Sequence, residues 1–185
     1  MSFRLPTYVE NLYLLGTADF TGHGNAKVNN IIGNSGDNRL AGLNGNDTIA
    51  GDLGDDRILG GNLNELLDGG DCADTLTGGT GADTFVFAGL SQTGPKPTVA
   101  DILADFTPGD DLIDLSALDA ITNNANPNVA FTFLTGAFTG VAGQLHAVQI
   151  GGNTYLEMDV NGDTVADATI RLNGLLTLTA ADFVL

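Results

Sequence analysis

Oxygen-bearing side chains recur every nine residues between positions 24 and 86 of this 185-residue chain. The segment divides into seven consecutive nonapeptides, of which the first is GNAKVNNII and the last is GGTGADTFV. The sixth position of each nonapeptide always carries a carboxylate or a carboxamide: Asn29, Asn38, Asp47, Asp56, Glu65, Asp74 and Asp83. Such oxygens, together with backbone carbonyls, are the ligands of hard divalent cations. The chemistry that this column predicts is therefore cation binding.

Calcium is the cation that the ligands favour, because it accepts six to eight oxygen ligands in flexible arrangements, whereas magnesium requires a stricter octahedron. A soft-metal site lacks suitable ligands, since the chain has one cysteine, Cys72, and two distant histidines, His23 and His146. Cys72 stands where a glycine is expected, and we interpret it as a small tolerated residue. We therefore predict several calcium ions as the cofactor.

The remaining columns predict the elements that position these ligands. Glycine occupies the first position of all seven nonapeptides and recurs at the second and fourth. Glycine permits positive φ and close backbone approach, so the first six residues predict a tight turn with inward-facing carbonyls. The eighth position is always apolar: Ile31, Leu40, Ile49, Ile58, Leu67, Leu76 and Phe85. The last three residues thus predict a very short strand, stable only when stacked in parallel, as in a solenoid.

The nonapeptides resemble the GGxGxDxUx repeat of the RTX (repeats-in-toxin) family. The resemblance implies an all-β fold, a right-handed parallel β-roll with calcium between turns, and two nonapeptides per coil. Nonapeptide n then lies over nonapeptide n+2, so the ligands of alternate nonapeptides fall into two separate rows. The first row is Asn29, Asp47, Glu65 and Asp83, and the second is Asn38, Asp56 and Asp74.

The predicted metal-site residues are the turn glycines and the acidic or amide column. They are Gly33, Gly36, Asn38, Gly42, Gly45, Asp47, Gly51, Gly54, Asp56, Gly60, Glu65, Gly69, Asp74, Gly78, Gly81, Asp83 and Asp101. The strongest sites are expected at Asp47, Asp56, Asp74 and Asp83. The first two nonapeptides carry neutral asparagines, and the first also carries Lys27, so sites there should be weak or empty. The fifth departs from the pattern at Leu63 and Glu65.

The C-terminal half resembles the C-terminal domain of serralysin-type secreted proteases, through DILADFTPGDDLIDLS at 101–116 and the terminal DFVL. The ending DFVL is similar to the end of a type I secretion signal. By the same resemblance, Asp101 and Asp105 complete a calcium site at the last coil, with simple turn capping as the alternative. Alternating apolar residues predict strands in a small antiparallel cap or sandwich, with a short helix near 116–120.

Three domains are expected: a capping segment at 1–23, the β-roll at 24–86, and a C-terminal β-rich cap with a secretion signal at 87–185. The stretch SQTGPKPT at 91–98 predicts a loop at the second boundary. The abrupt start suggests a piece of a longer protein.

An EF-hand-like spacing begins with Asp159, Asn161 and Asp163. Thr164 and Ile170, however, stand where the loop requires a glycine and a bidentate acid, so we predict a polar hairpin turn.

Several function classes are not expected. A net charge of −17 with six lysines and arginines argues against nucleic acid. The chain has no HExxH zinc motif, no GxSxG motif and no Walker phosphate loop, so we do not expect intrinsic catalysis. No stretch reaches 18 apolar residues, and no classical signal peptide is visible.

A glycine-rich, anionic chain is costly to order, so we expect it to fold only when calcium binds. The favoured function is a secreted, extracellular bacterial module that folds on calcium after type I secretion. Its partners would be the secretion apparatus and a catalytic domain upstream. The alternative is a polysaccharide-binding or adhesin module, against which stand the absence of tryptophan and the presence of only three tyrosines.

Overall fold

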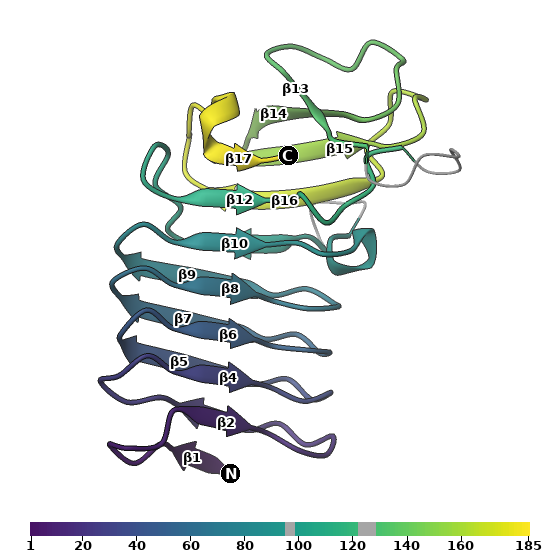
Figure 1. Ribbon diagram of the computed structural model, residues 1–185. Helices are drawn as coiled ribbons and strands as arrows, with labels where there is room; N and C mark the ends of the chain where they lie inside the picture. The colour runs from purple at the N-terminus through teal and green to yellow at the C-terminus, as the bar shows by residue number, and fades with distance from the viewer. Residues whose placement is uncertain (95–98, 122–128) are drawn as a thin grey trace.

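A computed structural model describes residues 1–94, 99–121 and 129–185. Its strands form two facing sheets that wind around one core (Figure 1). The ten-stranded sheet runs in the order β1 (Ser2–Arg4), β3 (Thr21–His23), β5 (Arg39–Asn44), β7 (Arg57–Asn62), β9 (Thr75–Thr80), β11 (Asp101–Leu103), β16 (Ala168–Asn173), β15 (Asn153–Asp159), β14 (Gln144–Ile150) and β13 (Thr132–Leu134). The seven-stranded sheet runs in the order β17 (Phe183–Val184), β12 (Leu112–Asp114), β10 (Thr84–Val86), β8 (Leu66–Asp68), β6 (Thr48–Ala50), β4 (Asn30–Ile32) and β2 (Asn11–Tyr13).

Successive nonapeptides deliver their strands to opposite sheets, so each coil of the roll contains two of them. Thr48 pairs with Leu66, and Leu66 pairs with Thr84, each time two nonapeptides further along the chain. All pairs between β1 and β12 along the two sheets are parallel. The predicted stacking of nonapeptide n on nonapeptide n+2 is therefore present in the structure, and the all-β roll is confirmed.

The eighth-position residues form the centre of the core. All seven expose at most 2% of their surface. Leu103 and Ile113 extend the same ladder beyond the repeats, because β11 and β12 keep the register of β9 and β10. Each coil thus buries its apolar residues only by stacking on its neighbours.

Residues 1–23, which the sequence assigns to a capping segment, lie in the same two sheets as the repeats. Ser2 pairs with Thr21 and Asn11 pairs with Asn30, so these partners stand slightly further apart in the chain than two nonapeptides. The domain boundary near residue 23 stays a prediction, although the hydrogen-bonded sheets continue across it.

The C-terminal part extends the roll. Strand β16 pairs in parallel with β11, and β15 and β14 then add antiparallel strands to the same sheet. The predicted antiparallel strands therefore exist, but they continue an edge of the ten-stranded sheet. Strand β17, which lies within the terminal DFVL, closes the other sheet by pairing with β12.

The helix predicted near 116–120 is wrong. The chain makes a turn there, in which the Leu118 N–H donates to the Leu115 carbonyl and the Ser116 N–H donates to Asp114 Oδ1. The aspartate side chain satisfies the backbone locally, which favours a turn over a helix. The described helices are two short 3₁₀ segments, η1 (Leu90–Gln92) and η2 (Ala180–Asp182).

Nowhere in the described parts of the chain is a helix long and apolar enough to cross a membrane. The loop predicted at 91–98 includes residues 95–98, which lie outside the described residues.

Candidate metal centre

The turns of the roll lie along its two edges (Figure 1). The sixth-position side chains stack in two rows, one from the even and one from the odd nonapeptides. In the row of even nonapeptides, each carboxylate accepts a hydrogen bond from the residue one coil earlier. Asn38 N–H donates to Asp56 Oδ1 at 2.6 Å, and Asp56 N–H donates to Asp74 Oδ1 at 2.7 Å. Asp74 N–H then donates to Asp101 Oδ1 at 2.8 Å, so Asp101 is the last member of this row.

The row of odd nonapeptides is built in the same way except at Glu65, neither of whose carboxylate oxygens accepts a hydrogen bond. Asn29 N–H donates to Asp47 Oδ1 at 2.7 Å, and Glu65 N–H donates to Asp83 Oδ1 at 2.9 Å. Asp83 N–H donates to Asp111 Oδ1, also at 2.9 Å. The sequence reasoning missed Asp111, because it follows Asp83 by 28 residues and lies outside the nine-residue period. The available signal was the motif Asp-x-Ile at 111–113, which repeats the end of a nonapeptide.

Four of the stacked carboxylates have oxygens without a partner. Buried oxygens without a hydrogen bond include Asp47 Oδ2, Asp56 Oδ2, Asp74 Oδ2 and both carboxylate oxygens of Glu65. An unsatisfied buried polar group costs about 1–3 kcal/mol, and more if it is charged. Five such oxygens in two rows are therefore the mark of a site that a cation completes.

A glycine at the first position of each nonapeptide lies opposite its sixth-position side chain. An added Cβ at Gly51 would collide with Asp56 Oδ2 and with the Gly69 carbonyl oxygen, and one at Gly42 would collide with Asp47 Oδ2. The other first-position glycines face their own sixth-position side chains in the same way: Gly24, Gly33, Gly60, Gly69 and Gly78. Carboxylate and carbonyl oxygens of adjacent coils thus converge on a space that only glycine leaves open.

The fourth-position glycines have a different role. An added Cβ at Gly54 would collide with the Gly36 backbone, and one at Gly81 would collide with the Leu63 backbone. Gly36 and Gly45 likewise lie against the backbone of the preceding coil. These four predicted residues therefore set the close stacking of the coils, and Gly45, Gly54 and Gly81 also have positive φ.

Burial raises the pKa of several of the stacked carboxyl groups. Desolvation raises the pKa of Asp47 to about 6 and of Asp56 to about 7. It raises the pKa of Glu65, Asp74 and Asp101 to about 8, with neighbouring carboxylates adding to the effect. Without a cation, ionising these carboxyl groups at neutral pH costs free energy through desolvation and through repulsion between carboxylates. A bound divalent ion would offset both costs.

The first two nonapeptides close their turns with amides. Asn25 N–H donates to Asn29 Oδ1 at 2.7 Å, and Asn29 Nδ2 donates back to Asn25 Oδ1 at 3.3 Å. Asn34 and Asn38 form the same pair, at 2.8 and 2.9 Å. A carboxamide supplies the donor that a carboxylate lacks, so these turns need no cation. The sequence reasoning did not identify Asn25 and Asn34.

Two further acidic positions act as turn caps. Asp105 accepts hydrogen bonds from Gly78 N–H and Gly79 N–H, both at 2.9 Å, which fits the turn-capping alternative. Asp159 accepts three backbone N–H groups of its own loop, those of Asn161, Gly162 and Thr164, which fits the predicted polar turn.

Side chains alone do not complete a metal site. Within the described ranges, no three His, Cys, Asp or Glu side chains gather in a group that could hold a metal ion. Each candidate site must therefore combine one or two carboxylates with backbone carbonyls, as calcium sites do.

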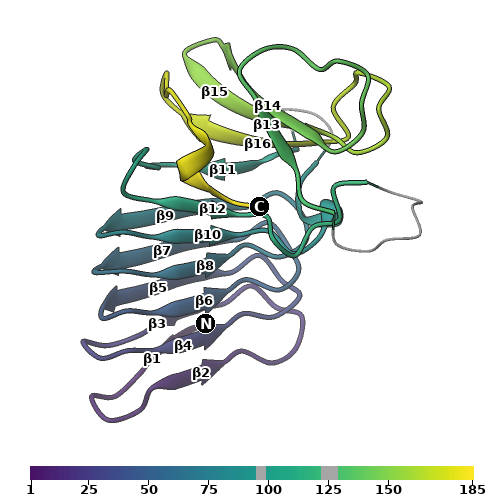
Figure 2. The same ribbon diagram turned by 45° about the horizontal axis from the view of Figure 1, so that its top comes forward.

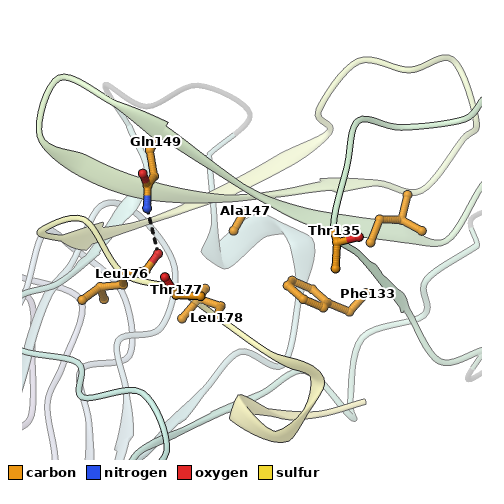
Figure 3. A pocket seen from close by; sticks show the side chains of 8 residues that line it. Phe133, Thr135, Ala147, Gln149, Leu176, Thr177 and Leu178 are labelled. Carbon is orange, nitrogen blue, oxygen red and sulfur yellow. Dashed lines mark hydrogen bonds between the residues drawn. The ribbon is translucent and has the colours of Figure 1, made fainter.

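The pocket in Figure 3 lies outside the rows, between β13, β14 and residues 176–178. Gln149 Nε2 donates to the Leu176 carbonyl across it at 3.0 Å. Its lining includes Phe133, Ala147 and Leu178 and no charged side chain. The pocket therefore offers neither a carboxylate ligand for a metal ion nor an acid–base group.

Comparison with known families gives a match to the peptidase M10 serralysin C-terminal family, over residues 15–185. The chain belongs to this family. As a serralysin C-terminal domain it is an RTX-type calcium-binding repeat, so the predicted resemblance is confirmed. A search of curated proteins found no match.

Among solved structures, the serralysin C-terminal domain is similar to the AlgE6R3 subunit of the mannuronan C5-epimerase from Azotobacter vinelandii. The two are 26% identical with a TM-score of 0.54, over 97% of this chain and 86% of that one. The AlgE6R2 subunit of the same epimerase is 28% identical with a TM-score of 0.46, over 89% and 90%.

Proposed function

We propose that this domain folds when calcium binds and that it acts as the secretion and folding module of a larger bacterial exoprotein. The observation that carries the proposal is the set of buried carboxylate oxygens without partners, at Asp47, Asp56, Glu65 and Asp74. Stacked anions of this kind do not assemble favourably without a counterion.

The residues that would hold calcium follow from the convergence of oxygens. On the even edge they are Asp56, Asp74 and the Gly69 carbonyl, and Asp101 would extend the row. On the odd edge they are Asp47, Glu65 and Asp83 with the carbonyls of Gly60 and Gly78. Bound calcium would supply the positive charge that lets adjacent coils stack.

The size of the effect suits a switch between compartments. With a dissociation constant of about 0.1 mM, each site stabilises the fold by about 1.4 kcal/mol at about 1 mM calcium and by almost nothing at about 0.1 µM. Four or five sites give roughly 6 to 7 kcal/mol, which is comparable to the whole stability of a domain. The chain would therefore be unfolded inside a bacterium and folded outside.

The C-terminal residues support the secretion part of the proposal. In the folded chain Phe183 and Asp182 are buried, Asp182 Oδ1 accepts a hydrogen bond from Gly109 N–H at 2.7 Å, and Phe183 pairs with Ile113. A type I secretion apparatus that reads this segment would need the unfolded chain. A catalytic domain attached upstream would then be exported with it.

The test is circular dichroism and calorimetry of the purified chain in chelator, in magnesium and in calcium. We expect a large gain of β signal in millimolar calcium only. An equal β signal in chelator and in calcium would contradict the proposal. Export of a fused reporter from cells that carry a type I system, with and without residues 182–185, tests the secretion part separately.

A further inference from the structure

Glu65 is the one glutamate among the sixth-position residues, and its side chain behaves differently from those of the aspartates. In the even row, Asp56 and Asp74 each use Oδ1 to accept a backbone N–H from the preceding coil, which leaves only Oδ2 without a partner. Both carboxylate oxygens of Glu65 are buried without a partner, and the residue is 3% exposed. Glu65 therefore has more free buried oxygens than any aspartate of the two rows.

The backbone around Glu65 keeps the register of the roll. Strands β6, β8 and β10 lie one above another (Figure 2), and their residues pair in parallel. Leu66 N–H donates to the Asp47 carbonyl at 2.8 Å, and Thr84 N–H donates to the Glu65 carbonyl at 2.9 Å. Glu65 N–H donates to Asp83 Oδ1, as the aspartates do in their own rows. No shift of the backbone therefore absorbs the extra methylene group of Glu65.

The extra methylene group changes where the carboxylate lies. An added Cβ at Gly42 or at Gly51 would collide with an aspartate Oδ2, whereas one at Gly60 would meet Cγ of Glu65 at 2.9 Å and Oε2 at 3.1 Å. The same Cβ would lie 2.6 Å from the Gly78 carbonyl oxygen. The carboxylate of Glu65 therefore lies beside a backbone carbonyl of the next coil, in a place where it accepts no N–H.

The neighbours of Glu65 in the odd row are acidic. The carboxylates of Asp83 and Asp47 are close enough to repel that of Glu65. Asp47 Oδ2 is itself buried without a partner, and an added Cβ at Gly42 that collides with it would lie 2.7 Å from the Gly60 carbonyl oxygen. Within the described residues, no lysine or arginine forms an ion pair with any of these carboxylates. Three free oxygens on two adjacent coils are thus left without a positive partner.

We infer that Glu65 binds one calcium ion through both of its carboxylate oxygens, whereas each aspartate of the rows offers only one. The inference rests on the proposed binding of calcium by this domain. Calcium accepts six to eight oxygen ligands and takes carboxylates through one oxygen or two, so a two-oxygen ligand suits it better than it suits octahedral magnesium. Asp47 Oδ2 and the carbonyl oxygens of Gly60 and Gly78 would be the further ligands. The residue that departs from the repeat pattern is thereby the richest single ligand of the odd row.

The first experiment compares melting temperatures, followed by circular dichroism, from limiting to saturating calcium. Glu65→Asp keeps the charge and restores the repeat pattern. An aspartate there can accept a backbone N–H at any calcium concentration, as its neighbours do, so the diagnostic quantity is the part of the difference that grows with calcium. We expect about tenfold weaker binding at this site, which lowers the melting temperature relative to the parent by about 3–6 °C between limiting and saturating calcium.

Two further variants complete the series. Glu65→Gln should lose at least as much as Glu65→Asp, because a carboxamide binds a cation through one oxygen only. Glu10→Asp is the matched control, because it shortens an exposed glutamate by the same methylene group and should shift the melting temperature by less than about 2 °C. An equal, calcium-dependent loss in Glu10→Asp and Glu65→Asp would overturn the inference, as would a difference between Glu65→Asp and the parent that is the same at every calcium concentration.

The second experiment is a crystal structure of the parent chain grown in calcium, which decides the matter even if the Glu65 variants do not fold. We expect both carboxylate oxygens of Glu65 at about 2.3–2.6 Å from one ion. Binding through a single oxygen, or no ion beside Glu65, would overturn the inference. The proposed function fails separately: an equal β signal of the parent in chelator and in calcium would contradict calcium-driven folding, while an ion held by both oxygens would still confirm the role of Glu65.

Discussion

Replacing Asp56 by asparagine should lower stability in calcium without lowering it in chelator. Asp56 is 3% exposed, and its Oδ2 lacks a partner while its Oδ1 accepts the Asn38 N–H. The carboxamide keeps the Oδ1 acceptor, so the backbone contact survives and only the anionic oxygen is lost. Asn38, in the same row, shows that asparagine is accommodated there.

The expected loss is the contribution of one site. At about 1 mM calcium and a dissociation constant of about 0.1 mM this is about 1.4 kcal/mol. For a chain of this size that corresponds to a fall of about 3–6 °C in the melting temperature. In chelator the variant should show at least as much β structure as the parent, because burial raises the pKa of Asp56 to about 7 and its ionised form opposes folding.

The assay is thermal unfolding followed by circular dichroism at several calcium concentrations, with the residual β signal compared in chelator. Asp55→Asn is the control, because it removes the same charge from an exposed side chain of the same turn. A loss of stability for Asp56→Asn that is the same at every calcium concentration would refute the reasoning, since the residue would then act through hydrogen bonding alone.

Three other outcomes follow from the turns. Gly51→Ala should destabilise the calcium form by about 1–3 kcal/mol in urea unfolding, because its methyl group enters the space of the convergent oxygens, whereas Gly136→Ala, with open space around it, should have little effect. Leu63→Gly should stabilise the fold by about 0.5–1 kcal/mol, because an exposed leucine at φ 85° is strained, and a measured loss would contradict this. Without calcium, the free energy of unfolding should rise as the pH falls from 8 to 5, because burial raises the pKa of Asp74 to about 8 in the folded chain. The stability that protonated Asp74 contributes is fully present below its unfolded pKa near 4 and is lost as the pH rises through 8. With calcium the same acidification should lower stability, because protons compete with the cation. A stability that changes with pH in the same direction with and without calcium, as measured by circular dichroism, would contradict this.

The repeated part of the fold could be predicted almost in full. A nine-residue period with one apolar column and one acidic column determines the strands, the core ladder and the two ligand rows. The parallel registers, offset by two nonapeptides, agree with it. This works because each coil of a solenoid contacts only its neighbours, so local pattern and tertiary contact coincide.

Prediction failed where the chain leaves the period. The short helix expected near 116–120 is a turn, because Asp114 caps the backbone. Asp111 joins the odd row across 28 residues, and β16 pairs with β11 although β12 to β15 lie between them in the chain. Insertions of this length between stacked strands leave no periodic trace in the sequence.

The sequence by itself thus determined that the chain is a β-roll of the calcium-binding kind with carboxylates aligned in rows, because the residue types and the nine-residue period set the structure of each coil. Only the tertiary structure decided which carboxylate oxygens lose water without gaining a partner, and which glycines hold open the space before them. It alone gathered four arginines, scattered from residue 4 to residue 171, on one face of a sheet. Burial and the juxtaposition of distant strands are properties of the assembled coils, which no single nonapeptide contains.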